Sequence, residues 1–181
     1  MSWDFMFFFN SLLLGAGLAM DAFSVSLANG LNEPKMKIRK MVIDDYDEIY
    51  ALWMSCAGMG LNNLDDSREG IDKFLKRNPD TCFVAQCDNQ IVGVIIVGND
   101  GRRGYIYHTA VNPQYRNRGI ARQLVETSVQ GLKQCGINKV ALVVFDRNEN
   151  GNAFWEKLGF TVREDLVYRN KAITEMIRID T

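Results

Sequence analysis

VNPQYRNRGIA, at positions 111–121, separates an expected strand over residues 104–111 from an expected helix over residues 119–134. Glycine lets the backbone approach a ligand, and the free N–H groups of a helix N-terminus present partial positive charge to phosphate oxygens. Arg116, Arg118 and Arg122 add side-chain charge at the same place. The segment therefore predicts an anion cradle, with a capped helix rich in basic residues as the alternative.

The pattern outside this segment predicts an α/β fold with a mixed sheet. β-branched and aromatic runs bounded by turn residues indicate strands, and apolar residues at helical spacing indicate helices. The apolar run 139–145 is typical of a strand covered on both faces, so we expect it to be central and parallel. We expect strands at 37–42, 81–86, 91–97, 104–111, 139–145, 160–163 and 172–179, and helices at 43–57, 67–77, 119–134 and 152–158. The turn 87–90 carries an Asp-Asn pair that favours a tight hairpin, and the loop 58–63 is expected to contact substrate.

The anion segment and its surroundings resemble the GNAT superfamily of N-acetyltransferases. That family's pyrophosphate signature is Arg or Gln, two residues, Gly, one residue, then Gly or Ala, and Arg116, Gly119 and Ala121 match it. The strand ending His108-Thr109-Ala110-Val111 precedes the signature, as it does in the family. Asn148, Trp155 and the pair Gly159-Phe160 follow in the expected order, so the resemblance covers about residues 36–181.

The resemblance implies a GNAT fold in which two central parallel strands splay apart and acetyl-CoA lies between them. It implies direct attack by a primary amine of a small molecule or peptide, in a ternary complex without a metal ion. Backbone N–H groups would stabilise the oxyanion that develops in this reaction. The residues implied to bind acetyl-CoA are Ala110, Val111, Arg116, Arg118, Gly119, Ile120, Ala121, Asn148 and Trp155.

The catalytic side chains are less clear from the sequence. Many GNAT relatives use a tyrosine to protonate the departing thiolate, but Trp155 occupies that position here and an indole N–H is too weak an acid. Tyr168, Tyr105, Tyr107 or water could replace it, and we prefer Tyr168. His108 is the best base candidate, because its usual pKa range suits collecting an ammonium proton through water. The missing tyrosine also leaves open a CoA-binding module without efficient turnover, tethered to a membrane.

Several other polar residues have two readings. Glu48, Asp65 and Asp66 either form a pocket for a cationic substrate or are solvated helix ends. The four cysteines lack a CxxC pair and accompany a single histidine, which argues against zinc. We expect all four thiols to be buried in a reducing compartment. A net charge of −1 gives no general attraction to nucleic acid.

The first 34 residues have a different character. Residues 5–31 contain no lysine or arginine and, as a helix, could cross a hydrocarbon layer of about 30 Å. Lys35, Lys37, Arg39 and Lys40 follow, so the remaining chain is expected to face the cytoplasm. Gly17 to Ser26 resemble the first transmembrane helix of the manganese efflux pump family, but a lone helix cannot transport. We expect 1–34 to be an anchor, an oligomerisation helix or a fusion remnant, and 35–181 to be the N-acetyltransferase domain; a homodimer is left open.

Overall fold

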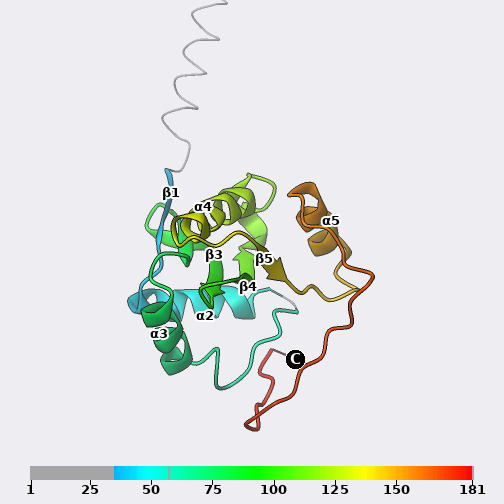
Figure 1. Cartoon of the computed structure of the whole chain (residues 1–181). Helices are drawn as coiled ribbons and strands as arrows, with labels where there is room; N and C mark the ends of the chain where they lie inside the picture. The colour runs from blue at the N-terminus through cyan, green and yellow to red at the C-terminus, as the bar shows by residue number, and fades with distance from the viewer. Residues whose placement is uncertain (1–34, 57, 181) are drawn as a thin grey trace, which may run out of the picture. The chain divides into compact units, whose positions relative to one another are not determined.

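The computed structural model describes residues 35–56 and 58–180. Met36–Thr181 forms one compact unit built on a five-stranded sheet in the order β1-β2-β3-β4-β5 (Figure 1). The strands are β1 Met36–Lys40, β2 Phe83–Cys87, β3 Gln90–Asn99, β4 Gly104–Val111 and β5 Val140–Leu142. The helices are η1 Ile43–Asp45, α2 Tyr46–Met54, α3 Arg68–Arg77, η2 Pro113–Tyr115, α4 Ile120–Gln134 and α5 Glu149–Lys157. The expected mixed sheet is confirmed, because β1 to β4 pair antiparallel and β4 pairs parallel with β5.

The β2–β3 hairpin turns where the sequence predicts it. Asp88 and Asn89 have φ values of 48° and 67°, and Asp and Asn tolerate this left-handed region better than most residues. Strand β3 is buried on both faces along almost its whole length. It is therefore β3, rather than the run 139–145, that forms the central strand.

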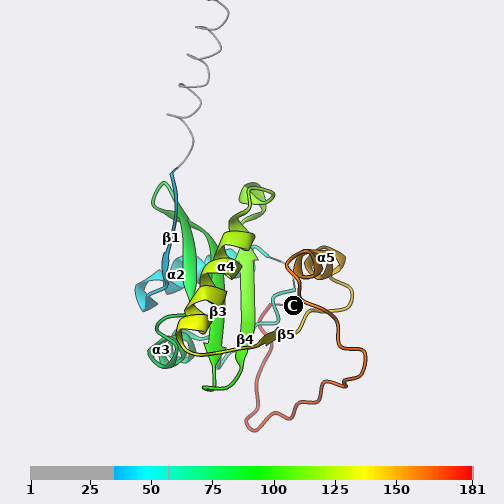
Figure 2. The same ribbon diagram turned by 45° about the horizontal axis from the view of Figure 1, so that its top comes forward.

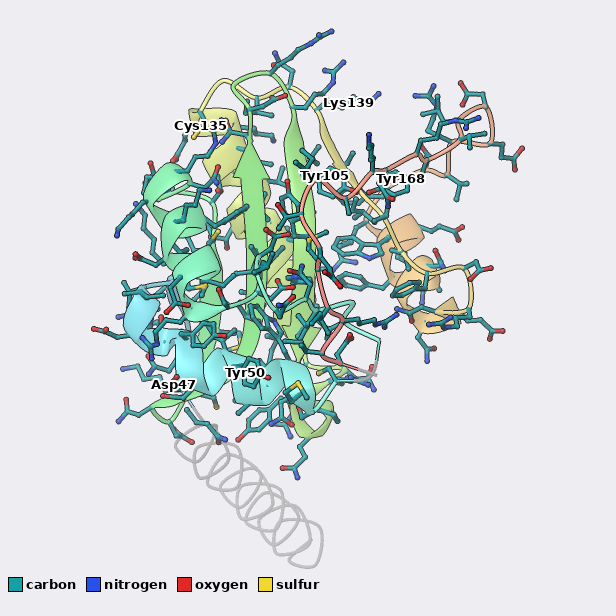
Figure 3. The ribbon with its side chains drawn as sticks, turned by 90° about the horizontal axis from the view of Figure 1, so that it is seen from below. Asp47, Tyr50, Tyr105, Cys135, Lys139 and Tyr168 are labelled. Carbon is teal, nitrogen blue, oxygen red and sulfur yellow. The ribbon has the colours of Figure 1, made fainter. Side chains whose placement is uncertain are left out.

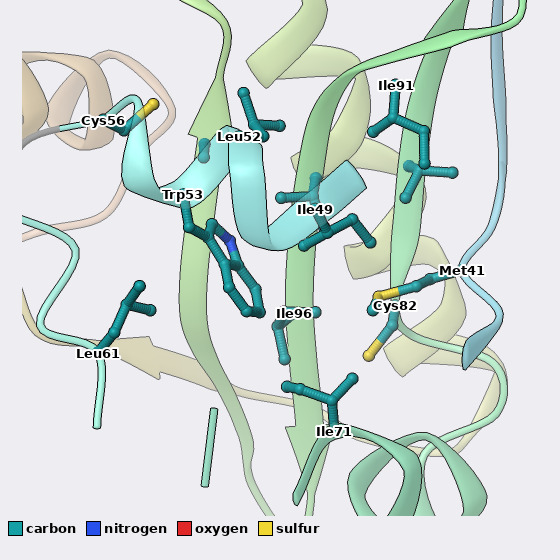
Figure 4. Packing of buried hydrophobic residues seen from close by; sticks show 13 residues of the cluster. Met41, Ile49, Leu52, Trp53, Cys56, Leu61, Ile71, Cys82, Ile91 and Ile96 are labelled. Atoms are coloured by element: carbon teal, nitrogen blue, oxygen red, sulfur yellow. The ribbon is translucent and has the colours of Figure 1, made fainter. Parts of the chain in front are cut away.

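Helices cover both faces of the sheet (Figure 2). Helix α4 packs on one face through Leu124, Val125 and Leu132, together with Val92 and Val97 of β3. Helices α2 and α3 cover the other face, where the core is built on residues including Trp53, Ile49 and Ile71 (Figure 4). Each helix buries one apolar stripe and leaves its polar side in solvent.

Strand β4 contains an extra residue that changes where its side chains point. The β3–β4 register shifts between Ile96, which pairs with His108, and Val97, which pairs with Ile106, so Tyr107 is left over as a bulge. A bulge places consecutive side chains on the same face of a sheet. Tyr107 contacts Phe74 and His108 contacts Trp53, so both side chains face α2 and α3.

Within the run 139–145 only Val140–Leu142 forms a strand, which is parallel to β4 as expected, but the prediction that it is central is wrong. Strand β5 pairs only with Gly104 to Ile106 of β4 and stands at the edge of the sheet. The side chains of Val143 and Phe145 are 56% and 40% exposed. Beyond Ile106, β4 has no β5 partner, which opens the expected gap between the two parallel strands.

The expected closing strands at 160–163 and 172–179 do not form. A β-rich segment needs a ladder partner, and the end of the second range pairs instead with the loop after α2. In that pairing Ile177 N–H donates to Asn63 Oδ1 at 2.7 Å, and Ile179 N–H donates to the Leu61 carbonyl at 3.0 Å. The expectation of four buried cysteines also needs correction, because Cys135 follows the last turn of α4 and is exposed.

The apolar segment 5–31 and its resemblance to an efflux pump helix lie outside the described residues. Within 35–56 and 58–180, no helix has the length and apolar character to cross a membrane. In the same part of the chain, no group of three or more His, Cys, Asp or Glu side chains is placed to hold a metal ion.

Candidate active site

The predicted anion cradle lies where β4 leads into α4. Asn112 caps the short helix η2 by accepting a hydrogen bond from Gln114 N–H at 3.0 Å. Gly119 is the N-cap of α4 with φ 76°, a left-handed conformation that favours glycine. No side chain caps α4, and its first turn contains no acidic residue. A Cβ atom at Gly119 would meet nothing within 4 Å, so open space lies beside the start of α4, where the first N–H groups, including those of Ile120 and Ala121, have no partner within the helix.

Arginine side chains surround this open helix end. Arg116 Nε donates to the Val111 carbonyl at 3.3 Å, which holds its guanidinium against the end of β4. Arg118 donates to the Gln114 carbonyl at 3.3 Å, and its guanidinium lies 5.1 Å from the Tyr115 ring centroid. The structure therefore brings together helix N–H groups and two exposed cations, the combination that binds phosphate groups.

The gap between β4 and β5 lies along the last residues of β4, just before the cradle. Ala110 and Val111 pair with Val94 and Gly93 of β3, and β5 does not reach either of them. Ala110 is buried and Val111 is half-buried. These two residues thus lie on the β4 edge that faces the gap, as the resemblance implied.

Helix α5 stands beyond the gap. Asn148 caps it by accepting a hydrogen bond from Gly151 N–H at 3.0 Å. Trp155 packs between Phe154 and Phe160 at centroid distances of 5.0 and 5.1 Å. The residue in the usual tyrosine position is therefore part of an aromatic cluster and brings no hydroxyl group to the site.

His108 forms a buried pair with Asp66. The distance from His108 Nε2 to Asp66 Oδ1 is 2.7 Å, and the two side chains are 14% and 4% exposed. An ionised carboxylate only accepts hydrogen bonds, so Nε2 carries the hydrogen in this pair, and in the neutral form of the imidazole Nδ1 has a lone pair. Nδ1 is buried and has no hydrogen-bond partner among the described residues. Trp53 packs against the imidazole at a centroid distance of 5.3 Å.

Sequence reasoning missed this partnership, because it interpreted Asp66 as part of a pocket for a cationic substrate or as a solvated helix end. Asp66 is 3% exposed, and Ser67 caps α3 instead. Asp66 also accepts a hydrogen bond from Asn62 N–H at 2.7 Å, which fixes the loop after α2. His108 and Asp66 are 42 positions apart, so no local pattern could have paired them.

Three tyrosines gather near the point where β5 leaves β4. The rings of Tyr105 and Tyr107 are 4.9 Å apart, and Figure 3 shows Tyr168, from the irregular C-terminal segment, beside Tyr105. Burial raises the pKa of the Tyr105 and Tyr107 phenols, and the nearby Tyr168 phenol adds to both increases. The three candidate proton donors are thus neighbours.

The loop after α2 is held by residues distant in the sequence. Gly60 N–H donates to Asp180 Oδ2 at 2.6 Å, and Arg178 Nε donates to Asp180 Oδ1 at 2.8 Å. Burial acts to raise the pKa of Asp180, but the hydrogen bonds from Arg178 and Gly60 lower it overall. The predicted substrate loop is therefore fastened at one end by Asp180 and at the other by Asp66. Glu48, in contrast, accepts from Ile91 N–H at 3.1 Å and lies apart from this loop.

Comparisons with known protein families, sequences and structures all find acetyltransferases. A family model described as the acetyltransferase (GNAT) family matches residues 46–160. An acetyltransferase of Sodalis glossinidius is 33% identical over 140 residues, covering 77% of this chain and 97% of that protein. The structure of PaiA N-acetyltransferase from Thermoplasma acidophilum in complex with coenzyme A has a TM-score of 0.64 at 20% identity, covering 72% of this chain and 92% of that chain.

A second solved structure is the aminoglycoside N-acetyltransferase AAC(6')-Iy in complex with a bisubstrate analogue, CoA-S-monomethyl-acetylneamine. Its TM-score is 0.62 at 20% identity, covering 76% of this chain and 99% of that chain. The likeness to these two structures shows that the fold is shared.

Proposed function

The chain belongs to the acetyltransferase (GNAT) family, and from this premise we propose that it transfers an acetyl group from acetyl-CoA to a primary amine of a small molecule or peptide. The observation that carries the proposal is the uncapped N-terminus of α4, which opens onto free space at Gly119. Such a helix end attracts a diphosphate through its N–H groups and its dipole. PaiA and AAC(6')-Iy, which share the fold, were both solved with CoA or a CoA analogue.

The residues present fit a CoA ligand. The left-handed glycine leaves room for a diphosphate where any side chain would intrude, and Arg116 and Arg118 add positive charge. The β4 edge at Ala110 and Val111 has no β5 partner, which leaves its backbone for the pantetheine arm, and Asn148 and Trp155 are the further residues proposed to contact acetyl-CoA. When bound, acetyl-CoA supplies the thioester whose carbonyl carbon the amine attacks.

His108 is the proposed base. An amine is mostly protonated near neutral pH, and its nitrogen can form the new C–N bond only after the ammonium proton has left. Asp66 holds the imidazole with Nε2–H toward the carboxylate, so the lone pair of Nδ1 in the neutral imidazole, which has no partner among the described residues, is the one left to take this proton. Asp66 then stabilises the imidazolium by its negative charge.

Tyr168 is the proposed acid. As the C–S bond breaks, the electron pair stays on sulfur and the thiolate takes a proton from a neighbouring donor, while the attacking nitrogen releases its second proton to solvent and becomes the amide nitrogen. Tyr168 is 66% exposed, so its phenol can regain a proton from solvent after each cycle. Trp155 cannot fill this role, because its indole N–H is far too weak an acid.

Thiol release from acetyl-CoA tests the proposal, using a panel of aliphatic amines, an aminoglycoside and peptides with free N-termini. We expect release with at least one acceptor and the matching acetylated product in the mass spectrum. Thermal stabilisation by CoA, with no release on any acceptor, would favour a binding module that has lost turnover. The absence of both stabilisation and release would overturn the proposal.

Tethering through residues 5–31 and the division into 1–34 and 35–181 stay predictions. A chain beginning at Met36 is expected to keep full activity and to lose only its association with membranes. Full activity in the soluble fraction for both the whole chain and the shorter chain would contradict the anchoring role.

A further inference from the structure

Two tyrosines and one carboxylate form an exposed patch beside the proposed active site, and we call Tyr105, Tyr107 and Asp65 the tyrosine–aspartate patch. The rings of Tyr105 and Tyr107 lie 4.9 Å apart at an angle of 50°. The edge contact between Tyr107 and Phe74, at 5.3 Å, fixes the orientation of the Tyr107 ring. Tyr107 is nevertheless 54% exposed, so an aromatic surface held in place faces solvent.

Asp65 gives this aromatic surface a negative charge. The Asp65 side chain accepts a hydrogen bond from Asn62 Nδ2 at 3.3 Å, and it forms no salt bridge with any residue in the described part of the chain. Its neighbour Asp66 is paired with His108, and Asp180 is paired with Arg178. Asp65 is therefore the carboxylate of this loop that remains available to a ligand.

The charge of Asp65 affects the pKa of the Tyr107 phenol. Burial raises the pKa of Tyr107 first, and the negative charge of Asp65 raises it further. The phenols therefore stay neutral at physiological pH and present π faces, which attract cations, next to a carboxylate. This combination favours an organic ammonium group.

The tyrosine–aspartate patch lies next to the residues that we propose to deprotonate the acceptor amine. Tyr107 is the bulge residue that precedes His108, and Asp65 precedes Asp66. The amine that reacts must be neutral when it attacks, and a cation-binding patch would oppose its deprotonation. The patch is therefore suited to a positive charge that the acceptor keeps throughout the reaction.

Resting on the proposed acetyl transfer, we infer that the acceptor carries a second ammonium group, which the tyrosine–aspartate patch binds while the first amine is acetylated. An alkyl diamine is the simplest acceptor of this class. The second charge orients the chain so that its other end reaches His108.

The test compares initial rates with 1,4-diaminobutane and n-pentylamine, which have the same number of non-hydrogen atoms and differ in one terminal ammonium. With the full chain we expect kcat/KM to be about twofold to fivefold higher for the diamine, as one cation–π contact at an exposed site provides. Tyr107→Leu and Asp65→Asn are each expected to raise KM for the diamine about twofold to fivefold. The KM for acetyl-CoA should stay the same, and the ratio of kcat/KM for the diamine to kcat/KM for pentylamine should fall toward one.

Tyr107→Phe is the matched control, because phenylalanine keeps the π face and the edge contact with Phe74. It should preserve most of the preference for the diamine. Equal rates with both amines in the parent chain, or an unchanged preference in Tyr107→Leu, would overturn the inference and leave acetyl transfer intact. If no amine or peptide of the wider panel is acetylated, the proposed function itself fails, which is a different result.

Discussion

His108 Nε2 and Asp66 Oδ1 are 2.7 Å apart, and this contact joins the bulged strand β4 to the loop that precedes α3. His108→Gln removes the basic Nδ1 while keeping a polar side chain of similar size. We expect kcat to fall by about 10²–10⁴-fold, the usual contribution of a general base, with CoA affinity unchanged. Steady-state kinetics and calorimetry with CoA measure the two quantities separately.

Thr109→Val is the control for the histidine substitution on the same strand. The Thr109 hydroxyl is buried without a hydrogen-bond partner in residues 35–56 and 58–180, so valine should be tolerated and activity kept. Equal activity of His108→Gln and the parent chain would remove His108 from the mechanism. Its contact with Asp66 would then be purely structural.

Gly119→Glu should abolish CoA binding. The glutamate side chain places a carboxylate where the diphosphate is expected, and we expect Kd for CoA to rise by about 100-fold or more, equivalent to about 2.7 kcal/mol. Gly101→Glu is matched to it, because Gly101 also has a left-handed φ, 86°, and open space around its Cβ position. Both variants bear a similar backbone strain of about 1–2 kcal/mol, but only Gly119→Glu should lose affinity.

Gly131→Ala should destabilise the protein, although glycine to alanine inside a helix usually stabilises by about 1 kcal/mol. A Cβ at Gly131 would lie 2.4 Å from the carbonyl oxygen of Asp80, which is backbone and cannot move aside easily. We expect a net loss of about 2 kcal/mol in the free energy of unfolding, measured with urea. Gln130→Ala, at an exposed position of the same helix, should change stability by less than about 0.5 kcal/mol.

Cys82 should make stability depend on pH in the alkaline range. Burial raises the pKa of this thiol from 9.0 to about 11. The folded chain therefore keeps the thiol proton at pH values where the unfolded chain has lost it, so the stabilising contribution is complete below pH 9 and disappears as the pH rises through 11. As the pH rises from 8 to 11, the free energy of unfolding should fall in both proteins, and the fall should be about 2 kcal/mol smaller in Cys82→Ala than in the parent chain. Parallel pH profiles of urea unfolding for the two proteins would contradict this expectation.

Local sequence patterns were sufficient for the elements around the cradle. Helix α4 begins where glycine and the apolar spacing of Leu124 and Leu132 place it, and the Asp88-Asn89 turn forms because both residues tolerate positive φ. These features depend on conformational preferences within a few residues. The step from strand to helix at 111–121 could therefore be anticipated from the sequence, and its role in binding CoA stays a prediction.

Features that depend on long-range pairing could not be anticipated in the same way. The apolar composition of 139–145 indicated a central strand, but the burial of a strand depends on which strands lie beside it, and β5 lies at the edge. The segment around Ile177 has strand-like composition, yet its backbone bonds go to Asn63. The partner of His108 likewise depends on the path of the loop and not on any motif.

The bulge at Tyr107 affects how relatives of this chain should be aligned. When a protein without the extra residue is aligned to this chain, a one-position gap is needed in β4. Only with that gap do its residues before the bulge align with the residues of this chain that share their face of the sheet, such as Tyr105. Without the gap, a residue directed toward α4 would be equated with one directed toward α2 and α3. Substrate preferences transferred between such proteins by ungapped comparison would then be assigned to the wrong side chains.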